Sequence, residues 1–150
     1  MILYLIQFFS LPSFGQESLF TGEILPVFYV RDVRASVKFY NDLGFQFNYF
    51  HDYDDNSDVK QWVKNNPPIY AEMQAGTQKF AIHLLLSDTT GYRATGTRHY
   101  FEVNDVKTHY ERLKEKGIDV GELIEQPWMI MFSVVDPDGH FIYFYTRPEE

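Results

Sequence analysis

The chain has 150 residues and no cysteine, so disulfide bonds and thiol chemistry are excluded and a reducing, cytoplasmic location is expected. A formal net charge of −8 argues against a nucleic-acid surface, because neutralising phosphates requires clustered lysine and arginine, and it suits a cationic ligand or simply aids solubility. With 45% hydrophobic and 18% aromatic residues, the chain is expected to form one domain with a substantial core.

The chain begins with an apolar stretch, Met1–Phe9, which is too short to span a bilayer. No basic residue follows the amino terminus before Arg31, whereas a secretory signal normally begins with basic residues. Proline and glycine in the next stretch are typical of a linker. The sequence therefore predicts an N-terminal extension over residues 1–23, or an additional strand within it, followed by a single domain over residues 24–150.

The first half of this domain reads as a strand, a helix and three further strands. Apolar residues predict a strand over Ile24–Val30, and Asp32 is a good helix N-cap because its carboxylate can accept a hydrogen bond from a free helix N–H. Apolar residues recur at helical spacing up to Leu43, and Gly44 can adopt the left-handed conformation that closes a helix. Acidic residues in His51–Asp58 predict a polar loop. The later strands are expected at Phe45–Tyr49, with its three aromatic residues on one face, at Ile69–Met73 and at Phe80–Leu86.

The same pattern returns in the second half of the domain. Asp105 follows Asp32 by 73 residues, and Gly117 follows Gly44 by the same offset. Strands are expected around the second helix at His99–Val103, Val120–Ile124, Trp128–Val135 and Phe141–Tyr145, with a tight turn at Asp136–Gly139. Repetition of one supersecondary unit indicates two similar βαβββ modules of an α+β fold.

The modules are expected over residues 24–86 and 97–147, joined by a polar segment. Each half-sheet carries apolar residues on both faces. A helix can cover one face, so the other must meet a ligand, a partner or the second half-sheet.

Two βαβββ modules, with Val-x-Asp-Val before each helix and an Asp-Pro-Asp-Gly turn, resemble the vicinal oxygen chelate superfamily. This superfamily includes glyoxalase I, extradiol dioxygenases, fosfomycin-resistance enzymes and bleomycin-resistance proteins. The segment Glu125–Gly139 is further similar to the Glu-Gln-Pro-Trp…Asp-Pro-x-Gly stretch of bleomycin-resistance proteins. The resemblance implies a curved mixed sheet with helices outside, and a homodimer that confers antibiotic resistance by sequestering a cationic ligand without chemistry.

The resemblance also locates the positions at which metal-dependent members hold their ion. These positions carry Leu25, Arg98 and Tyr143 here, and on the remaining strand only His83 could coordinate a metal. His99 is one residue out of register and is expected to point to the opposite face. We therefore expect no metal and no cofactor, and binding rather than catalysis. A metal-dependent glyoxalase-type or dioxygenase-type enzyme is the alternative.

Without a metal, the curved sheet is expected to hold a small molecule against aromatic side chains, through stacking and cation–π attraction. Trp128 is favoured because the matching segment of bleomycin-resistance proteins lies at their binding groove. The family's Gly-Arg-Glu after this tryptophan is Met129–Met131 here, which makes the wall more apolar and favours an amphipathic ligand other than bleomycin itself. In a third interpretation, the aromatic residues only fill a dimer core. The candidate ligand-binding residues are Trp128, Phe28, Phe47, Tyr49, Trp62, His83, Arg98, Met131, Phe132 and Tyr143.

Overall fold

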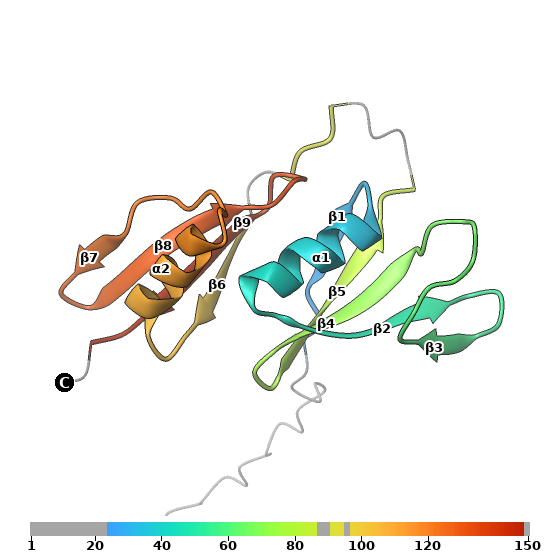
Figure 1. Cartoon of the computed structure of the whole chain (residues 1–150), viewed down its shortest axis with the longest axis horizontal. Helices are drawn as coiled ribbons and strands as arrows, with labels where there is room; N and C mark the ends of the chain where they lie inside the picture. The colour runs from blue at the N-terminus through green and yellow to red at the C-terminus, as the bar shows by residue number, and fades with distance from the viewer. Residues whose placement is uncertain (1–23, 87–90, 95–96, 149–150) are drawn as a thin grey trace, which may run out of the picture.

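A computed structural model describes residues 24–86, 91–94 and 97–148 of the chain, so the N-terminal extension expected over residues 1–23 lies outside the described residues. Two mixed sheets, each with one helix, make up these residues (Figure 1). Within them, no helix combines the length and apolar character needed to cross a membrane.

The first sheet has five strands in the order β1-β5-β4-β2-β3, with β1 parallel to β5 and the other neighbours antiparallel. The second sheet has the order β6-β9-β8-β7, with β6 parallel to β9 and the other neighbours antiparallel. Apart from β3 the two plans are equivalent, which confirms the predicted α+β fold of two βαβββ modules. The elements are β1 (Val27–Val30), α1 (Val33–Leu43), β2 (Gln46–Asp52), β3 (Ser57–Val59), β4 (Tyr70–Ala75), β5 (Gln78–Leu84), β6 (Arg98–Glu102), α2 (Val106–Glu115), β7 (Ile124–Gln126), β8 (Met129–Val135) and β9 (Phe141–Thr146).

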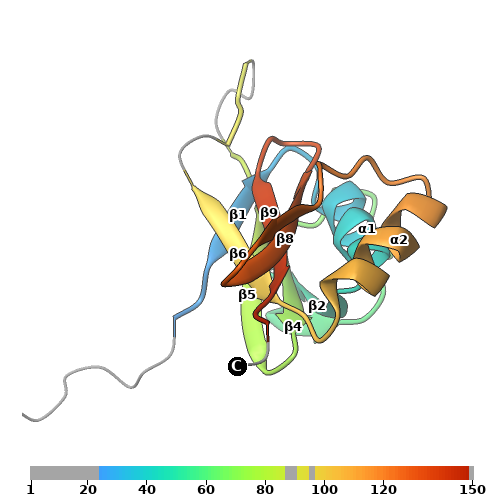
Figure 2. The same cartoon turned by 90° about the vertical axis from the view of Figure 1, so that its left-hand side faces the viewer.

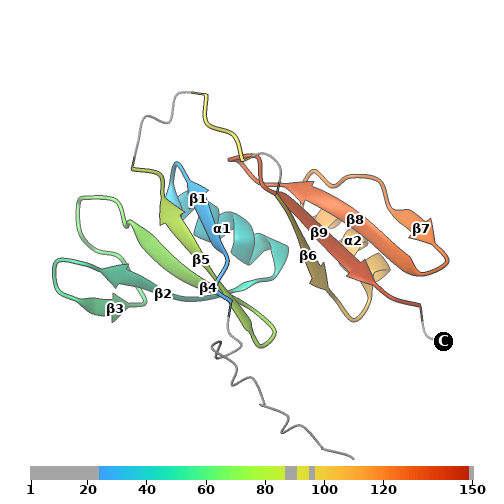
Figure 3. The ribbon, with the colours of Figure 1, turned by 180° about the vertical axis from the view of Figure 1, so that it is seen from behind.

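Both helices begin at the predicted caps. The Asp32 carboxylate accepts a hydrogen bond from the Ala35 backbone N–H at 3.0 Å, and Asp105 caps α2 in the same way through Thr108 at 3.0 Å. Gly44 ends α1 with φ +104°, a left-handed conformation that glycine adopts without strain. The two helices lie on the same side of the two sheets, so within the described part of the chain no helix covers the opposite faces, which we call the open faces (Figures 2 and 3).

The acidic segment over His51–Asp58 is a hairpin rather than the predicted loop. Strand β2 continues to Asp52, which pairs with Ser57 of β3. Acidic side chains would repel one another here, but the Lys64 ammonium lies 2.7 Å from Asp52, 3.3 Å from Asp54 and 3.0 Å from Asp55. The Lys64 cation from the following loop therefore stabilises the β2–β3 turn, whose acidic residues would otherwise repel one another.

The predicted alternation of β2 is also interrupted. A register shift between Phe47 and Tyr49 places Phe47 opposite Met73 but Tyr49 opposite Glu72. Adjacent residues on β4 point to opposite faces, so Phe47 packs toward the helix and Tyr49 toward the open side. The expectation that the aromatic residues of Phe45–Tyr49 share one face is wrong for Tyr49, because a β-bulge adds a residue that periodicity alone does not reveal.

One aromatic core connects the two modules on the helix side. The Phe45 ring from the first module lies 4.7 Å from Phe101 and 5.8 Å from Phe144 of the second, and Phe80 lies 6.0 Å from Phe101. Burying each such ring contributes about 1.5–3 kcal/mol. The modules are therefore joined by apolar packing as well as by the chain between them.

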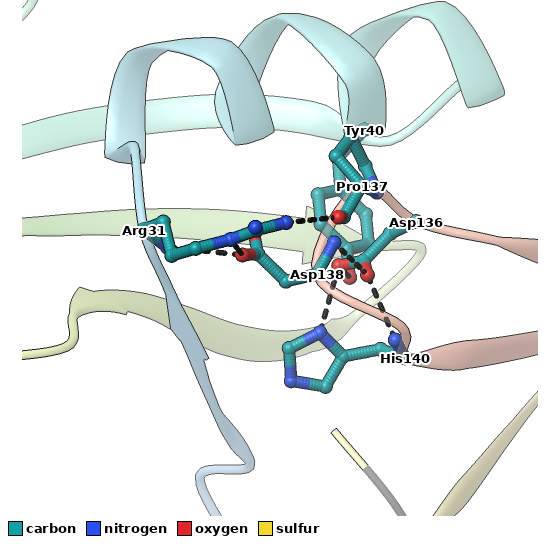
Figure 4. Close-up of polar contacts among 6 residues, drawn as sticks. All are labelled: Arg31, Tyr40, Asp136, Pro137, Asp138 and His140. Atoms are coloured by element: carbon teal, nitrogen blue, oxygen red, sulfur yellow. Dashed lines mark hydrogen bonds and ion pairs between the residues drawn. The ribbon is translucent and has the colours of Figure 1, made fainter. Parts of the chain in front are cut away.

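A polar cluster, which we call the junction clasp, joins the β8–β9 turn to Arg31, before α1, and to Tyr40 within α1 (Figure 4). The buried Asp136 carboxylate accepts hydrogen bonds from the Tyr40 hydroxyl at 3.0 Å and from the His140 ring Nδ1 at 2.8 Å. Asp138 accepts from the Arg31 backbone N–H at 3.2 Å and side-chain Nε at 2.6 Å. The Arg31–Asp138 contact spans 107 positions and the Tyr40–Asp136 contact 96, so the Asp-Pro-Asp-Gly turn sets the position of one module against the other.

In the junction clasp, burial and hydrogen bonding have opposite effects on the pKa of Asp136. Burial alone would raise the pKa of Asp136, but hydrogen bonds and charge from His140, with the hydrogen bond from Tyr40, outweigh it and lower that pKa. Burial, followed by the nearby Asp136 charge, raises the pKa of Tyr40. Asp136 is therefore an ionised acceptor and Tyr40 a protonated donor at neutral pH, which is the pairing that the geometry requires.

Candidate functional site: the open faces of the two sheets

Alternation along each strand decides which side chains reach the open faces. On β1, Phe28 and Val30 are buried against the helix side, whereas the Tyr29 side chain is 47% exposed. The strand register places His83 beside both Tyr29 and Tyr70, so these side chains share the open side of the first sheet. We call this surface, with Tyr49 and Glu72, the tyrosine–glutamate face.

The aromatic rings of the tyrosine–glutamate face form a wall across four strands. Tyr49 and Tyr70 lie nearly parallel, with ring centroids 6.3 Å apart. The His83 ring lies 5.5 Å from Tyr29 and 6.4 Å from Tyr70. Such a wall can stack a planar group and attract a cation to its π surface.

A carboxylate lies within this wall. The Glu72 residue is only 7% exposed, and its oxygens accept hydrogen bonds from Asn48 Nδ2 at 3.0 Å and from the Tyr49 hydroxyl at 3.1 Å, with the Lys79 ammonium 3.0 Å away. Burial by itself would raise the pKa of Glu72, but its hydrogen bonds to Lys79, Asn48 and Tyr49 outweigh burial and lower that pKa. Glu72 is therefore charged at neutral pH.

The open side of the second sheet has a different chemistry. We call it the arginine–tyrosine face, formed by Arg98, Tyr100, Tyr143, Tyr145 and Arg147. Tyr100 and Tyr143 are stacked at 4.6 Å, the Arg98 guanidinium lies 5.9 Å from the Tyr143 ring centre, and Arg147 lies 5.8 Å from that of Tyr145. Guanidinium groups over tyrosine rings form an aromatic surface with a positive charge at Arg98, while Glu102 lies 3.9 Å from Arg147.

The structure divides the ten predicted site residues between the two sides of the sheets. Phe28 and Phe132 are each 1% exposed, so they belong to the core on the helix side and do not lie on the open faces. Phe47 packs against the same core, and the Trp62 indole packs on its edge and donates to the Asn66 carbonyl at 2.6 Å. The reason is strand alternation, since each of these phenylalanines neighbours a residue on the open side. The residues that do lie on the open side are Tyr49, His83, Arg98, Met131 and Tyr143.

Trp128 lies apart from both groups. It precedes β8 in the β7–β8 turn and is 66% exposed. Sequence reasoning also missed open-side residues that strand pairing with His83 and Tyr143 would have identified. These are Tyr29, Tyr70, Glu72, Tyr100 and Tyr145.

The donor groups at the positions where metal-dependent relatives are expected to hold an ion do not suit a divalent cation. Leu25 is apolar, Arg98 is a cation, and the His83 ring Nδ1 lies 2.8 Å from the Leu84 carbonyl. His99 packs edge-on against Phe28 on the helix side, with ring centroids 4.2 Å apart, as its register predicts. Across residues 24–86, 91–94 and 97–148, no three His, Asp or Glu side chains are grouped as metal ligands. The side chains at these positions therefore do not fit a divalent metal ion.

Comparison with known structures supports the fold. TioX from Micromonospora sp. ML1 is 19% identical with a TM-score of 0.61, over 84% of this chain and 98% of that one. The bleomycin-binding protein of bleomycin-producing Streptomyces verticillus, in complex with copper(II)-bleomycin, is 20% identical with a TM-score of 0.58, over 85% and 96%. The fosfomycin resistance protein FosX of Listeria monocytogenes is 14% identical with a TM-score of 0.62, over 87% and 96%.

At these identities the structural neighbours establish the fold alone. A comparison with curated protein sequences finds no match. A family model, described as the glyoxalase/bleomycin resistance protein/dioxygenase superfamily, matches residues 24–144 and confirms the resemblance seen in the sequence. Because this match spans both modules and most of the chain, the protein belongs to the glyoxalase/bleomycin resistance protein/dioxygenase superfamily.

Proposed function

We propose that the protein binds a planar cationic or amphipathic small molecule on its open sheet faces and acts by sequestering it, as in antibiotic resistance. The observation that carries this proposal is the charged Glu72 carboxylate within the aromatic wall of the tyrosine–glutamate face. A carboxylate beneath π faces is complementary to a planar cation. Solved relatives that bind bleomycin support the same class of ligand.

The groups on these faces support the proposal of sequestration rather than turnover. The positions that bind metal in metal-dependent relatives carry Leu25, Arg98 and Tyr143. The His83 side chain lies beside Tyr29 and Tyr70 rather than beside a candidate nucleophile. Tyrosine hydroxyls, amides and one paired carboxylate are suited to holding a ligand in place.

We further propose that the protein is a homodimer in which a second copy covers the open faces. The second sheet leaves large apolar side chains exposed there, including Tyr100 at 48%, Val135 at 48% and Phe141 at 39%. A contiguous exposed apolar surface often marks an interaction site. The Arg98 guanidinium of one copy is opposite in charge to the Glu72 carboxylate of the other, and pairing of the two faces would enclose a ligand groove.

Calorimetric titration tests the binding proposal. Bleomycin and a planar organic dication are titrated into purified protein, and we expect at least one to bind with a stoichiometry of one per chain or fewer. The ligand is then released and examined by mass spectrometry. Unaltered ligand supports sequestration, whereas a transformed product at more than one turnover per chain would establish the enzymatic alternative. Absence of binding by both probes would count against a cation site.

Sedimentation velocity tests the dimer separately. We expect a dimer at micromolar concentration and a shift toward monomer for Tyr100→Glu, which adds a negative charge to the arginine–tyrosine face. Thermal unfolding of the variant provides the control, because Tyr100 is exposed and its replacement should leave the fold of one chain intact. A wild-type monomer at this concentration would refute the proposed assembly.

A further inference from the structure

A second site candidate, which we call the junction cavity, lies between the modules. Its lining shares Tyr100 with the arginine–tyrosine face but does not include Glu72 of the tyrosine–glutamate face. Its volume is about 680 Å³, within the usual range for small-molecule sites. The end of α1, the β4–β5 turn, strand β6 and helix α2 all contribute to its lining. Because its walls come from both modules, it depends on how the modules are held together.

One part of the junction cavity is aromatic. Phe45, Phe101 and Phe144 line it, and their ring centroids lie 4.7 to 6.3 Å apart. These rings also belong to the core that joins the modules, so their positions are fixed by packing on the far side. The cavity therefore has a preformed apolar floor that suits a flat apolar group.

The other part is positively charged and comes from one face of α2. Arg112 and His109, one helical turn apart, both line the cavity. The Arg112 guanidinium makes no ion pair within the described part of the chain. Glu102 also lines the cavity, but its carboxylate is engaged by the Tyr145 hydroxyl at 3.4 Å and lies 3.9 Å from Arg147. The potential at this end therefore favours an anion.

The His109 ring adds an unsatisfied polar atom at the same place. Its Nε2 is buried and has no hydrogen-bond partner among the described residues. Burial first, and then the positive charges of Arg112 and Lys116, lower the pKa of His109 to about 4, so the ring is neutral at pH 7. A neutral imidazole can still donate one N–H, and leaving a buried donor unpaired is unfavourable.

Stabilisation of the C-terminus of helix α1 does not explain why Arg112 lies here. Its guanidinium lies close to Gly44, with Nη2 2.7 Å from where a Cβ would be, and cations often stabilise a helix C-terminus. However, Lys116 already serves that terminus by donating to the Asp42 carbonyl at 2.8 Å, and Gly44 N–H closes the helix by donating to Asn41. Arg112 thus remains available to a ligand at the mouth of the cavity.

We propose that the junction cavity binds a small aromatic monocarboxylate. The carboxylate is held by the Arg112 guanidinium, and the ring of the ligand packs on Phe45, Phe101 and Phe144. His109 Nε2, which lacks a partner among the described residues at the same end of the cavity, supplies a second donor. A guanidinium suits this role because its parallel N–H groups match the two carboxylate oxygens.

The test uses benzoate, phenylacetate and indole-3-acetate as probes, titrated into the full-length chain and followed by calorimetry and by the imidazole NMR signals of His109. We expect saturable binding by at least one probe, with a shift of the His109 signals, and at least about tenfold weaker binding of phenethylamine, which carries the opposite charge. Binding should weaken about tenfold in Arg112→Gln. Arg34→Gln is the matched control, because Arg34 is an exposed arginine on α1 that does not line the cavity.

The outcomes separate this site from the open faces. Retained thermal stability of Arg112→Gln with lost probe binding supports the proposal, and so does probe binding that persists in Glu72→Gln. Absence of binding by all three probes at about 10 mM would overturn it, since even a weak specific site is filled at that concentration. Equal affinity in wild type and Arg112→Gln, or an unchanged His109 signal at saturation, would overturn it as well.

Discussion

The two modules share one plan but differ on the faces that the helices leave uncovered. Phe28 and Phe101 occupy equivalent positions in the repeat, and both pack on the helix side. On the open side, the first sheet has the buried carboxylate Glu72 among tyrosines, whereas the second places Arg98 and Arg147 over tyrosine rings. The difference suits the proposed function, in which helix-side positions specify the fold and open-side positions specify what is bound.

The largest expected effect concerns the junction clasp, which holds the two faces side by side. Asp136→Asn should lower the free energy of unfolding by about 3 kcal/mol, because the amide cannot accept all the hydrogen bonds that the buried carboxylate accepts. Urea unfolding followed by circular dichroism measures the change. Asp119→Asn, at an exposed loop position, is the control and should change stability by less than about 0.5 kcal/mol.

An Asp136→Asn variant as stable as wild type would mean that the clasp is not needed to hold the modules together. Far-UV and near-UV circular dichroism should be compared as well. We expect secondary structure to persist while aromatic signals weaken, because each module retains its own sheet and helix.

The next effect concerns Trp128, which the sequence favours as a stacking surface. Because its side chain is 66% exposed, Trp128→Ala should change stability by less than about 0.5 kcal/mol. If the indole covers a planar cationic ligand, affinity should fall by about 1–3 kcal/mol. Thermal unfolding without ligand, measured beside calorimetric affinity, separates the two roles. A large loss of stability with unaltered affinity would assign Trp128 to the core.

A smaller effect distinguishes the two open faces from each other. Glu72→Gln removes the negative charge with little change of shape and should weaken binding of a planar dication about tenfold, or about 1.4 kcal/mol. Arg98→Gln on the other face should leave that affinity unchanged or strengthen it. Glu111→Gln on the outer surface of α2 is a matched control for loss of one acid. Reversal of this ranking would place the cation on the arginine–tyrosine face.

The smallest expected effect is the response to pH. Because the pKa of Glu72 is lowered from 4.5 in the folded protein, its charge is fully present above that value and is lost as pH falls through the lowered pKa. Cation affinity should therefore change less than about twofold between pH 8 and pH 5.5, and stability contributed by Glu72 should decline only below about pH 4.5. Affinity that already falls tenfold between pH 7 and pH 5.5 would implicate a histidine instead.

Much of the fold could be predicted from local sequence. Asp32 and Asp105 begin the two helices, and Gly44 ends the first, because caps act through backbone groups only a few residues away. The Asp-Pro-Asp-Gly turn is equally local. The repeat at 73 residues then relates the two halves, so the α+β class follows without any knowledge of contacts. The superfamily was indicated by the resemblance of the motifs and is shown by the family model.

The site was harder to predict from the sequence, because alternation along a strand distinguishes two faces without indicating which one is covered. Phe28 and Tyr29 are adjacent aromatic residues on β1. The tertiary structure shows which of them belongs to the core, because Tyr40 of α1 packs against Phe28 while Tyr29 stays exposed. The bulge that turns Tyr49 to the open side depends on its pairing with β4. Local pattern therefore identified suitable side chains but not their direction.

Contacts between distant segments were decided by the tertiary structure alone. Arg31 meets Asp138 across 107 positions, and Lys64 neutralises the acids of the β2–β3 hairpin from the next loop. The junction cavity likewise exists only where Phe45 of one module meets Arg112 of the other. Sequence periodicity describes neighbours along an element, whereas burial, charge pairing and cavities arise between elements, and there the packed core selects one arrangement.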